Sequence, residues 1–360
     1  MKNIYLEKCY FDNYRNFENL SLDFAEQVNI IVGPNGSGKT NILEAISLLS
    51  PGKGLKSSNY DEICRYGHAK WLTRFKLNSK LGIAEINMEF NNAEKSRKID
   101  YNGSKISSAE LPNLINPIWV TPQMDGIFLG GASIRRKFLD RIVYNFNPIH
   151  AKRLSKYDYF IRERNKILAH GGWEGQGAWL STIEEKIVEE GILIETNRQK
   201  AVSSMQKAID ELETDFPKAI LSLSKLFDGQ YDLSNIAQVY VESLKNNRKK
   251  DSYAGRATLG VHRSDFIVVH SEKGCKAKYC STGEQKAMLI TLILASVESI
   301  IKNTDCTPVL LLDELFIHLD PNRKNQLAEY INFTKLQTFI TSTDMLGIEY
   351  LAKKSNIINL

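Results

Sequence analysis

Residues 33 to 40 of the chain are Gly33, Pro34, Asn35, Gly36, Ser37, Gly38, Lys39 and Thr40. They match the pattern G-x-x-x-x-G-K-[ST] at every fixed position. A short apolar run, Val28 to Val32, precedes them, and apolar residues at helical spacing follow as far as Leu49. A strand, a glycine-rich loop and a helix in this order turn backbone N–H groups toward a phosphate. We therefore expect Lys39 to contact the β- and γ-phosphates of a nucleotide and Thr40 to bind Mg²⁺.

A second motif is an apolar run, Val309 to Leu312, that ends at Asp313 and Glu314. It predicts a buried parallel strand with two carboxylates at its carboxyl end, where ligands bind in open α/β sheets. Asp313 is placed to hold the Mg²⁺ shell, and Glu314 to orient or deprotonate a water that attacks the γ-phosphate. The pattern is common by itself, but together with the glycine-rich loop it indicates a nucleotide hydrolase.

A third motif, C-S-T-G-E-Q-K from Cys280 to Lys286, comes directly before a predicted long helix. Two interpretations stay open. Ser281 and Glu284 have the spacing of a capping box and could simply begin the helix. Alternatively, the Ser281 hydroxyl and the helix N-terminus could bind a phosphate. The position of the motif shortly before Asp313 favours the second interpretation.

Composition is that of an ordinary folded protein. The 360 residues are 42% hydrophobic and 25% charged, with a net charge of +5 that permits a nucleic-acid partner without requiring one. We find no apolar stretch of membrane-spanning or signal-peptide length, which predicts a cytoplasmic protein without a membrane partner. The 5 cysteines form no C-x-x-C pair, so we expect reduced, structural thiols.

Periodicity predicts the order of the remaining elements. We expect two strands within the first 32 residues, antiparallel strands over 71–106, and a strand at 338–342. Residues 134–214 read as a helical hairpin or small bundle interrupted at Gly191, residues 245–256 as a loop, and residues 266–270 as a strand.

Together the motifs resemble the ABC-type ATPases, whose signature is close to L-S-G-G-Q, and within that class the bacterial RecF family. The resemblance rests on ordered segments across most of the chain, which are Tyr14 to Phe17, Gly33 to Asn41, Ser133 to Arg141, Gly260 to Asp265, Ser281 to Lys286, Val309 to Asp320 and Thr341 to Asp344.

The resemblance implies an α/β fold, with an ABC-type ATPase head and a compact, mostly helical lobe. The head would contain a mixed sheet with a P-loop core and an antiparallel β subdomain, formed by residues 1–133 and 257–360. The lobe, residues 134–256, would lie between the Q-loop and the signature. A helical hairpin in the interval from Gln123 to Ser281 could reach at most roughly 120 Å, which excludes the very long arms of SMC-type relatives.

The resemblance also assigns roles to residues in an ATP-sandwich dimer. Ser281, Gly283 and Gln285 would contact the γ-phosphate bound to the other subunit, and Asp320 would lie across the dimer as the D-loop. Gln123 would sense the γ-phosphate and join Thr40 and Asp313 around Mg²⁺. Catalysis would fall to Glu314, Lys39 and Gln123. The remaining nucleotide contacts would come from Gly33, Pro34, Asn35, Gly36, Ser37, Gly38, Lys39, Thr40 and Asn41.

For function, the resemblance implies a recombination mediator. An ATP-dependent homodimer would clamp gapped or junction DNA and, with RecO and RecR, promote RecA loading in repair and replication-fork maintenance. Weak ATP hydrolysis would release it. Two alternatives remain, a cytosolic ATPase subunit of an ABC transporter and a nucleotide-gated binding module whose turnover is irrelevant. The segment from Thr341 to Thr343 lacks the switch His of transporter ATPases, which speaks against the first.

Basic residues concentrate in three runs, which either form solvated faces or neutralise DNA phosphates. The runs are Arg135, Arg136, Lys137 and Arg141; Lys152, Arg153, Lys156, Arg162, Arg164 and Lys166; and Lys245, Arg248, Lys249, Lys250 and Arg256.

Overall fold

The computed structural model describes residues 4–79, 82–169, 175, 177–227, 235–304, 307–345, 351 and 355–360. Backbone contacts divide the chain into two compact units. We call Met1–Asp125, Glu211–Pro217 and Thr282–Leu360 the head unit, and Gly126–Asp210 and Lys218–Ser281 the helical unit. The predicted domains have other limits, since residues 126–133 and 257–281 belong by contact to the helical unit. The functional division into a head and an inserted lobe stays a prediction.

A parallel sheet of five strands forms the centre of the head unit, in the order β13-β3-β12-β11-β8. Every neighbouring pair runs parallel. Four of the strands, β3, β8, β11 and β12, are continuous or nearly continuous buried runs, as expected for a parallel sheet covered on both faces. The bounds are β3 Val28–Val32, β8 Asn116–Val120, β11 Pro308–Asp313, β12 Thr338–Ser342 and β13 Asn356–Asn359.

A separate antiparallel sheet of six strands has the order β2-β1-β4-β5-β6-β7. It confirms the antiparallel prediction for 71–106. The first 32 residues hold three strands instead of the predicted two, because the chain reverses tightly where Tyr14 pairs with Phe17. The bounds are β1 Ile4–Tyr14, β2 Phe17–Asp23, β4 Lys70–Ser79, β5 Gly82–Asn91, β6 Ser96–Tyr101 and β7 Ser104–Ile106.

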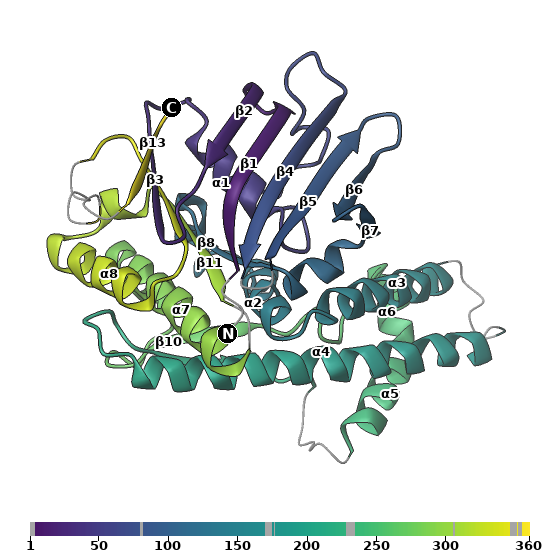
Figure 1. The fold of residues 1–360 in the computed structure, drawn as a ribbon. Coiled ribbons are helices and arrows are strands. Elements are labelled where there is room, and N and C mark those ends of the chain that lie inside the picture. The colour runs from purple at the N-terminus through teal and green to yellow at the C-terminus, as the bar shows by residue number, and fades with distance from the viewer. Residues whose placement is uncertain are drawn as a thin grey trace. The chain divides into compact units, whose positions relative to one another are not determined.

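Helices complete the layers of the head unit (Figure 1). Helix α1, Lys39–Ser47, lies between the two sheets, and its Ile42 and Ile46 share one apolar core with Phe75 of the antiparallel sheet and Leu311 of the parallel sheet. Helix α7, Thr282–Asn303, contacts β8 and β11. Helix α8, Pro321–Thr334, is joined to α7 by a hydrogen bond from Tyr330 to Glu298.

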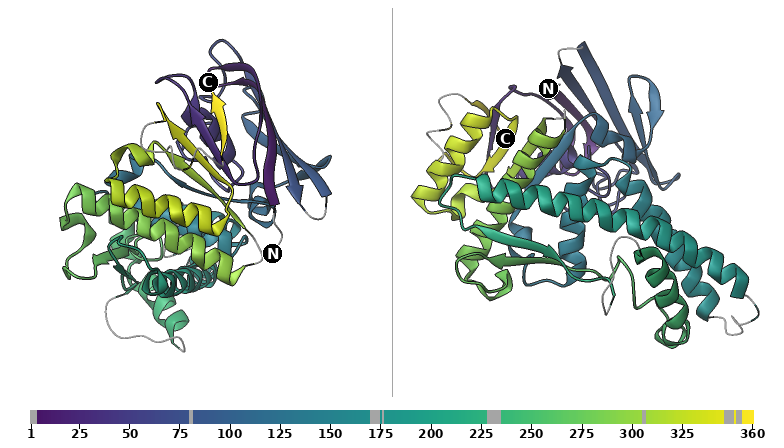
Figure 2. Two further views of the ribbon diagram at one scale, coloured as in Figure 1. Left: turned by 60° about the vertical axis from the view of Figure 1, so that its left-hand side comes forward. Right: turned by 90° about the horizontal axis from the view of Figure 1, so that it is seen from below.

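The helical unit is built around α4, Gly177–Glu211, whose 35 residues span about 52 Å (Figure 2). Gly191, which interrupts the heptad pattern, is where α4 meets two aromatic side chains. A Cβ at this position would lie 2.8 Å from the Tyr240 ring and 3.3 Å from the Tyr157 ring. The other elements are α2 Ala132–Phe146, α3 His150–Ala169, α5 Ile236–Asn246, α6 Arg248–Ala254, β9 Ala219–Leu223 and β10 Phe266–His270.

The loop predicted for 245–256 is wrong, because the segment contains the end of α5 and all of α6. Its sequence is polar because most of its side chains face solvent. Helix α6 is anchored through the buried Asp251.

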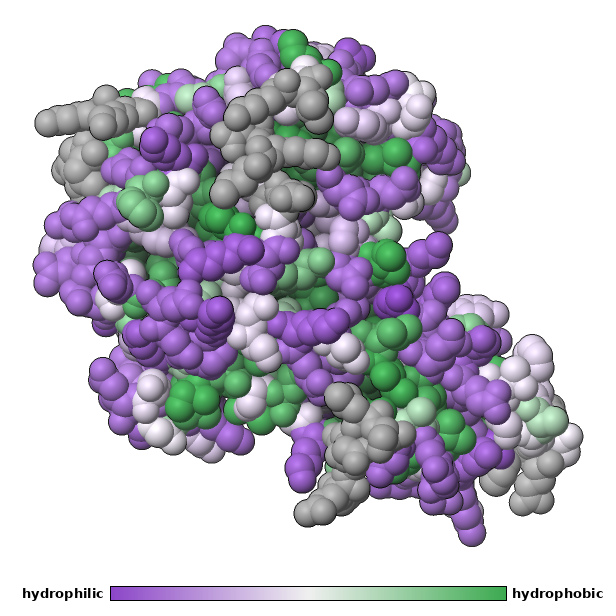
Figure 3. All heavy atoms as spheres, turned by 60° about the horizontal axis from the view of Figure 1, so that its bottom comes forward, coloured by the Kyte–Doolittle hydropathy of each residue, from purple (hydrophilic) through white to green (hydrophobic). Residues whose placement is uncertain are grey.

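Hydrophilic side chains predominate on the face drawn in Figure 3, and the hydrophobic ones gather in small groups between them. Among the described residues, no helix is long and apolar enough to cross a membrane. Cys9, Cys64, Cys275 and Cys280 are free thiols, whereas Cys306 lies outside the described residues.

Candidate nucleotide-binding site

The carboxyl ends of the parallel strands meet at one edge of the head-unit sheet, and the site is built there. The register pairs Asp313 with Thr341, Ser342 with Val32, and Leu312 with Val120. The glycine-rich loop follows β3, the two predicted carboxylates end or follow β11, and Gln123 comes shortly after β8. The fold therefore gathers at one edge residues that are up to about 300 positions apart.

The hairpin of β1 and β2 braces the glycine-rich loop. Gly38 has a φ of +108°, and a Cβ there would lie 2.4 Å from the Phe17 ring, so that only glycine fits. The Asn16 side-chain amide donates to the Ser37 carbonyl over 3.0 Å. Arg15 donates from Nε to the fully buried Glu44 carboxylate of α1 over 2.7 Å. These contacts explain physically why a Tyr-Arg-Asn-Phe segment accompanies the loop.

Lys39 is buried, with 4% of its surface exposed. Its ammonium donates to the carbonyl oxygens of Gly33 over 2.7 Å and Pro34 over 3.1 Å, and lies 4.0 Å from Glu314 Oε1. In the part of the chain that the structure describes, the buried Ser37 hydroxyl has no hydrogen-bond partner. A phosphate oxygen would supply an acceptor for both groups at the N-terminus of α1, so the loop fits a nucleotide phosphate.

Thr40 and Asp313 form the oxygen-rich part of the site. The Thr40 hydroxyl donates to Asp313 over 2.9 Å, although the two residues are 273 positions apart. A hydroxyl and a carboxylate are ligands that Mg²⁺ prefers, and it commonly binds through one or two such groups plus phosphates and waters. The residues present therefore fit the metal that the sequence predicts.

Thr341 is a site residue whose role the sequence did not reveal. Its hydroxyl donates to Asp313 Oδ1 over 2.8 Å and accepts from the Glu314 backbone N–H over 3.0 Å. It thus contacts both residues that supply the predicted carboxylates, the side chain of Asp313 and the backbone of Glu314. The available signal was the run from Thr338 to Ser342, a buried strand whose carboxyl end had to share an edge with Asp313.

Glu314 adopts a left-handed backbone conformation, with φ at +50°. Such a conformation costs a non-glycine residue about 1 kcal/mol or more and has to be imposed by surrounding contacts. The hydrogen bond to Thr341 supplies one of them. The Glu314 carboxylate is 31% exposed, so water can reach it beside the Lys39 ammonium.

Three other predicted nucleotide contacts, Asn41, Gln123 and Asp320, differ in their exposure and in their hydrogen-bond partners. Asn41 accepts from Lys56 over 2.6 Å and donates to Asn16 over 2.8 Å. Gln123 is exposed in the short 3-10 turn Pro122–Gly126. Asp320 is exposed and caps α8 by accepting from the Arg323 N–H over 3.1 Å.

The signature residues differ in accessibility. Ser281 directly precedes the first residue of α7 and is exposed, as is Gly283, where an added Cβ would meet open space. Gln285 is only 4% exposed. Of the three predicted signature contacts, Ser281 and Gly283 are therefore the two that a second subunit could reach directly.

The prediction that basic runs form solvated faces is wrong for several of their residues. Arg164 is fully buried, where it pairs with Glu184 and Asp251. Further members that make contacts inside the helical unit are Arg135 with Asp265, Arg136 with the Ser264 carbonyl, Arg153 and Lys156 with Glu190, and Arg248 with Glu184. The members that stay exposed are Lys137, Lys152, Lys156, Arg162, Lys166, Lys245, Lys249, Lys250 and Arg256.

The segment Gly260 to Asp265 organises the interior of the helical unit. Arg198 donates to the Val261 carbonyl over 2.7 Å and forms two hydrogen bonds with the Asp140 carboxylate. The His262 Nδ1 lies 2.9 Å from the Tyr157 hydroxyl, and burial lowers the pKa of His262 to about 4. His262 is therefore neutral at physiological pH.

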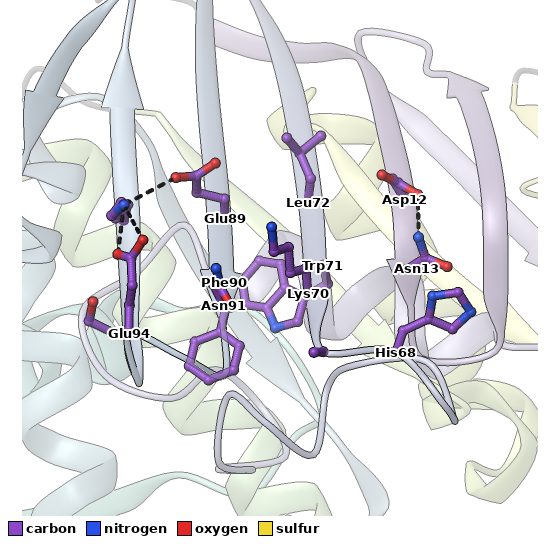
Figure 4. A pocket seen from close by; sticks show the side chains of 13 residues that line it. Asp12, Asn13, His68, Lys70, Trp71, Leu72, Glu89, Phe90, Asn91 and Glu94 are labelled. Atoms are coloured by element: carbon purple, nitrogen blue, oxygen red, sulfur yellow. Dashed lines mark hydrogen bonds and ion pairs between the residues drawn. The ribbon is translucent and has the colours of Figure 1, made fainter.

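A cavity of about 560 Å³ on the antiparallel sheet contains none of the predicted site residues (Figure 4). Its walls mix acids and bases, and Lys98 pairs there with Glu94 and Glu89. These charges largely neutralise one another, so the cavity has no evident preference for a charged ligand.

A family model, described as the RecF/RecN/SMC N terminal domain, matches residues 5–357. The DNA replication and repair protein RecF of Rickettsia bellii (strain OSU 85-389) is 48% identical over 365 residues, covering 100% of both chains. The chain belongs to the RecF family. RecF of Rickettsia felis is also 48% identical, covering 100% of this chain and 99% of that one.

Solved structures agree with RecF membership. The recombination mediator protein RecF-ATPrS in the RecFOR pathway matches with a TM-score of 0.85 and 26% identity, covering 99% of this chain and 96% of that one. The structure of RecF-ATP from the same pathway matches with a TM-score of 0.84 and 28% identity, covering 95% of this chain and 92% of that one. The Smc head domain of Pyrococcus furiosus shares the fold. It matches at 15% identity with a TM-score of 0.55, covering 99% of this chain and 93% of that one. These matches confirm the predicted ABC-type α/β fold class.

Proposed function

We propose that this chain is a cytoplasmic, ATP-dependent recombination mediator that clamps gapped or junction DNA as a homodimer. With RecO and RecR it would promote RecA loading in DNA repair and replication-fork maintenance. The observation that carries the proposal is the joining of Thr40 to Asp313, with Glu314 and Lys39 at the same edge. RecF relatives are named for DNA replication and repair, and solved RecF structures are named for ATP and the RecFOR pathway.

ATP would bind with its phosphates in the glycine-rich loop. Lys39 would exchange its two carbonyl contacts for the β- and γ-phosphates, and the buried Ser37 hydroxyl would donate to a phosphate oxygen. Thr40 and Asp313 would hold Mg²⁺, which neutralises developing phosphate charge when bound. The remaining contacts would come from the backbone N–H groups of the loop and the N-terminus of α1.

Glu314 would orient a water molecule and accept its proton while ATP and water become ADP and phosphate. We expect this hydrolysis to be weak, because Thr341, Ser342 and Thr343 stand where transporter ATPases carry a switch His. Hydrolysis would then act as a release step. The transporter alternative is disfavoured, because relatives that are 48% identical over the full chain are RecF proteins.

The homodimer would place Ser281 and Gly283 of one subunit against the nucleotide of the other. Both residues are exposed, and α7 begins directly after Ser281, so its N-terminal dipole would face the γ-phosphate. Gln285 would have to become uncovered to take part. Asp320 and Gln123, both exposed, would complete the contacts.

Binding of labelled DNA, followed by fluorescence anisotropy, tests the proposed function. We expect tighter binding to gapped than to intact duplex with ATP and Mg²⁺, and weaker binding to both with ADP. A DNA affinity that is independent of nucleotide would contradict an ATP-driven clamp.

Lys249 and Lys250 are exposed neighbours on α6, and we infer that they contact DNA phosphates. Reversing both to Glu should weaken DNA binding and reduce the slope of log K against log salt by about 2. Reversing Lys200 and Lys207, exposed on α4, changes the net charge equally and serves as the control. Equal losses in the two double variants would remove Lys249 and Lys250 from the interface.

A further inference from the structure

Two thiols lie in contact directly before the signature motif. The Sγ atoms of Cys275 and Cys280 are 3.7 Å apart, on either side of the 3-10 turn Ala277–Tyr279. Cys275 is partly exposed, whereas Cys280 is 9% exposed. Cys280 is followed immediately by Ser281, the residue proposed to contact nucleotide across the dimer.

The backbone of Cys275 is bonded to strand β10, whereas the backbone of Cys280 is bonded within a short turn. The Cys275 carbonyl accepts from the His270 N–H over 2.9 Å, and its neighbour Lys276 bridges to Val269 of β10. The Cys280 N–H donates to the Ala277 carbonyl of the short turn. A disulfide needs sulfurs about 2.05 Å apart, so the two must approach by roughly 1.7 Å. Because Cys275 is fixed to a strand, side-chain rotation and the Cys280 side of the turn must absorb the movement.

We propose that Cys275 and Cys280 are a modification site, at which a peroxide forms a reversible disulfide that lowers the activity of the signature motif. The partly exposed Cys275 thiolate attacks hydrogen peroxide, giving a sulfenic acid and hydroxide. The Cys280 sulfur then attacks the sulfenic sulfur and displaces water. Two thiols are oxidised, one peroxide is reduced to two waters, and a thiol reductant reverses the change.

The consequence for dimerisation rests on the proposed function. A disulfide next to Ser281 would shift or stiffen the residue that has to fit a phosphate bound to another subunit. Displacements of about 1 Å in positioning groups have large effects on assembled sites. The glycine-rich loop belongs to other elements, so nucleotide binding by the single subunit should be unaffected.

Peptide mapping of the whole protein tests the covalent step. Trypsin separates Gly274-Cys275-Lys276 from the peptide Tyr279 to Lys286, so a disulfide would hold these two peptides together in one species. After hydrogen peroxide treatment and without reduction, we expect that linked species, with its loss on adding dithiothreitol. Cys64, partly exposed elsewhere, is the internal control and should stay open to alkylation. Unlinked peptides, or Cys275 oxidised only to sulfinic acid, would overturn the proposal.

A functional measurement tests the effect on the signature. We expect peroxide to weaken ATP-dependent dimerisation at least tenfold without changing ATP affinity, and Cys275→Ser and Cys280→Ser to be insensitive. Linked peptides with unchanged dimerisation would overturn the regulatory claim. If the reduced protein fails to dimerise with ATP, the proposed dimer function fails, whereas the peptide map still decides whether the disulfide forms.

Discussion

Two buried cations, Arg164 in the helical unit and Lys39 in the head unit, have opposite kinds of surroundings. In the helical unit, the Arg164 guanidinium reaches Glu184 over 3.0 Å, Asp251 over 2.6 Å and the Leu244 carbonyl over 2.8 Å. In the head unit, the buried Lys39 ammonium donates to two backbone carbonyls, and the Glu314 carboxylate lies 4.0 Å away.

This difference distinguishes a cation that stabilises the fold, Arg164, from a cation that is available to bind a ligand, Lys39. Desolvation of a buried cation has to be offset by partners, and around Arg164 the protein supplies all of them. Around Lys39 the protein supplies two neutral carbonyl oxygens at hydrogen-bond distance and a carboxylate oxygen only at 4.0 Å, which leaves room for an anionic phosphate. Clusters of basic residues in a sequence are therefore a weak guide to a ligand site until their acidic partners are known.

The largest effect is expected from Arg164→Ala. The change leaves the buried carboxylates of Glu184 and Asp251 without their shared cation, which should cost about 3–5 kcal/mol of unfolding free energy. Arg162→Ala, exposed on the same helix, should cost less than about 0.5 kcal/mol. Thermal and urea unfolding measure both. Similar losses for the two variants would show that burial of Arg164 does not matter.

Lys39→Ala should give the opposite pattern. We expect ATP binding and hydrolysis to fall by about 10²–10³-fold, because the loop loses its positive charge at the phosphates. Stability without nucleotide should change little, since the change removes two carbonyl contacts and a 4.0 Å ion pair with the partly exposed Glu314. Lys53→Ala, at an exposed position after α1, is the control. Nucleotide titration and unfolding of the free protein decide the outcome, and normal ATP affinity would contradict the site.

Within the helical unit, Glu195 is a buried charge that its surroundings compensate only in part, because burial raises its pKa to about 7. Among the described residues, its buried Oε2 has no hydrogen-bond partner. The folded state therefore binds a proton that the unfolded state loses above about pH 4.5, so stability falls as pH rises from 4.5 to 7. Glu195→Gln should stabilise the protein by about 2 kcal/mol at pH 8 and little at pH 4.5.

The matched control for Glu195 is Glu185→Gln, which is exposed on the same helix. Unfolding of both variants between pH 4.5 and 8 checks the expectation. If Glu195→Gln raised the free energy of unfolding equally at every pH, the prediction that burial of the Glu195 carboxylate destabilises the fold would be contradicted.

Thr341→Val should have the smallest effect, slowing hydrolysis about tenfold with little change in KM. The substitution removes the hydroxyl that holds Asp313 and the Glu314 N–H, and Thr341→Ser should restore the rate. Thr338→Val, buried on the same strand away from the carboxylates, controls for packing. Steady-state kinetics make the test, and a raised KM with normal kcat would assign Thr341 to binding instead.

Local signals explain which elements sequence reasoning found. β3 and β11 are short apolar runs, the glycine-rich loop matches a fixed pattern, and α1 has apolar residues at helical spacing. β8 was missed because it is short and contains Pro117, which weakens a strand signal and suits its place at the sheet edge. β13 has only 4 residues, and its pairing depends on β3, more than 300 positions away.

Sequence motifs likewise predict only part of the candidate site. Lys39, Thr40, Asp313 and Glu314 stand in motifs, whereas Thr341 and Glu44 act through partners that only the fold brings near. The basic runs misled because Arg164 is separated by 87 positions from its partner Asp251. Pairings at such distances leave no mark on local composition.

Sedimentation velocity of the Glu314→Gln variant tests whether ATP joins two subunits into a dimer. If the open site binds ATP between two subunits and Glu314 activates water, the variant should bind ATP without hydrolysing it. We predict a dimer with ATP and Mg²⁺ and a monomer with ADP, and a wild-type protein that returns to monomer as ATP is consumed. A variant that stays monomeric in both nucleotides, with ATP bound, would contradict the account.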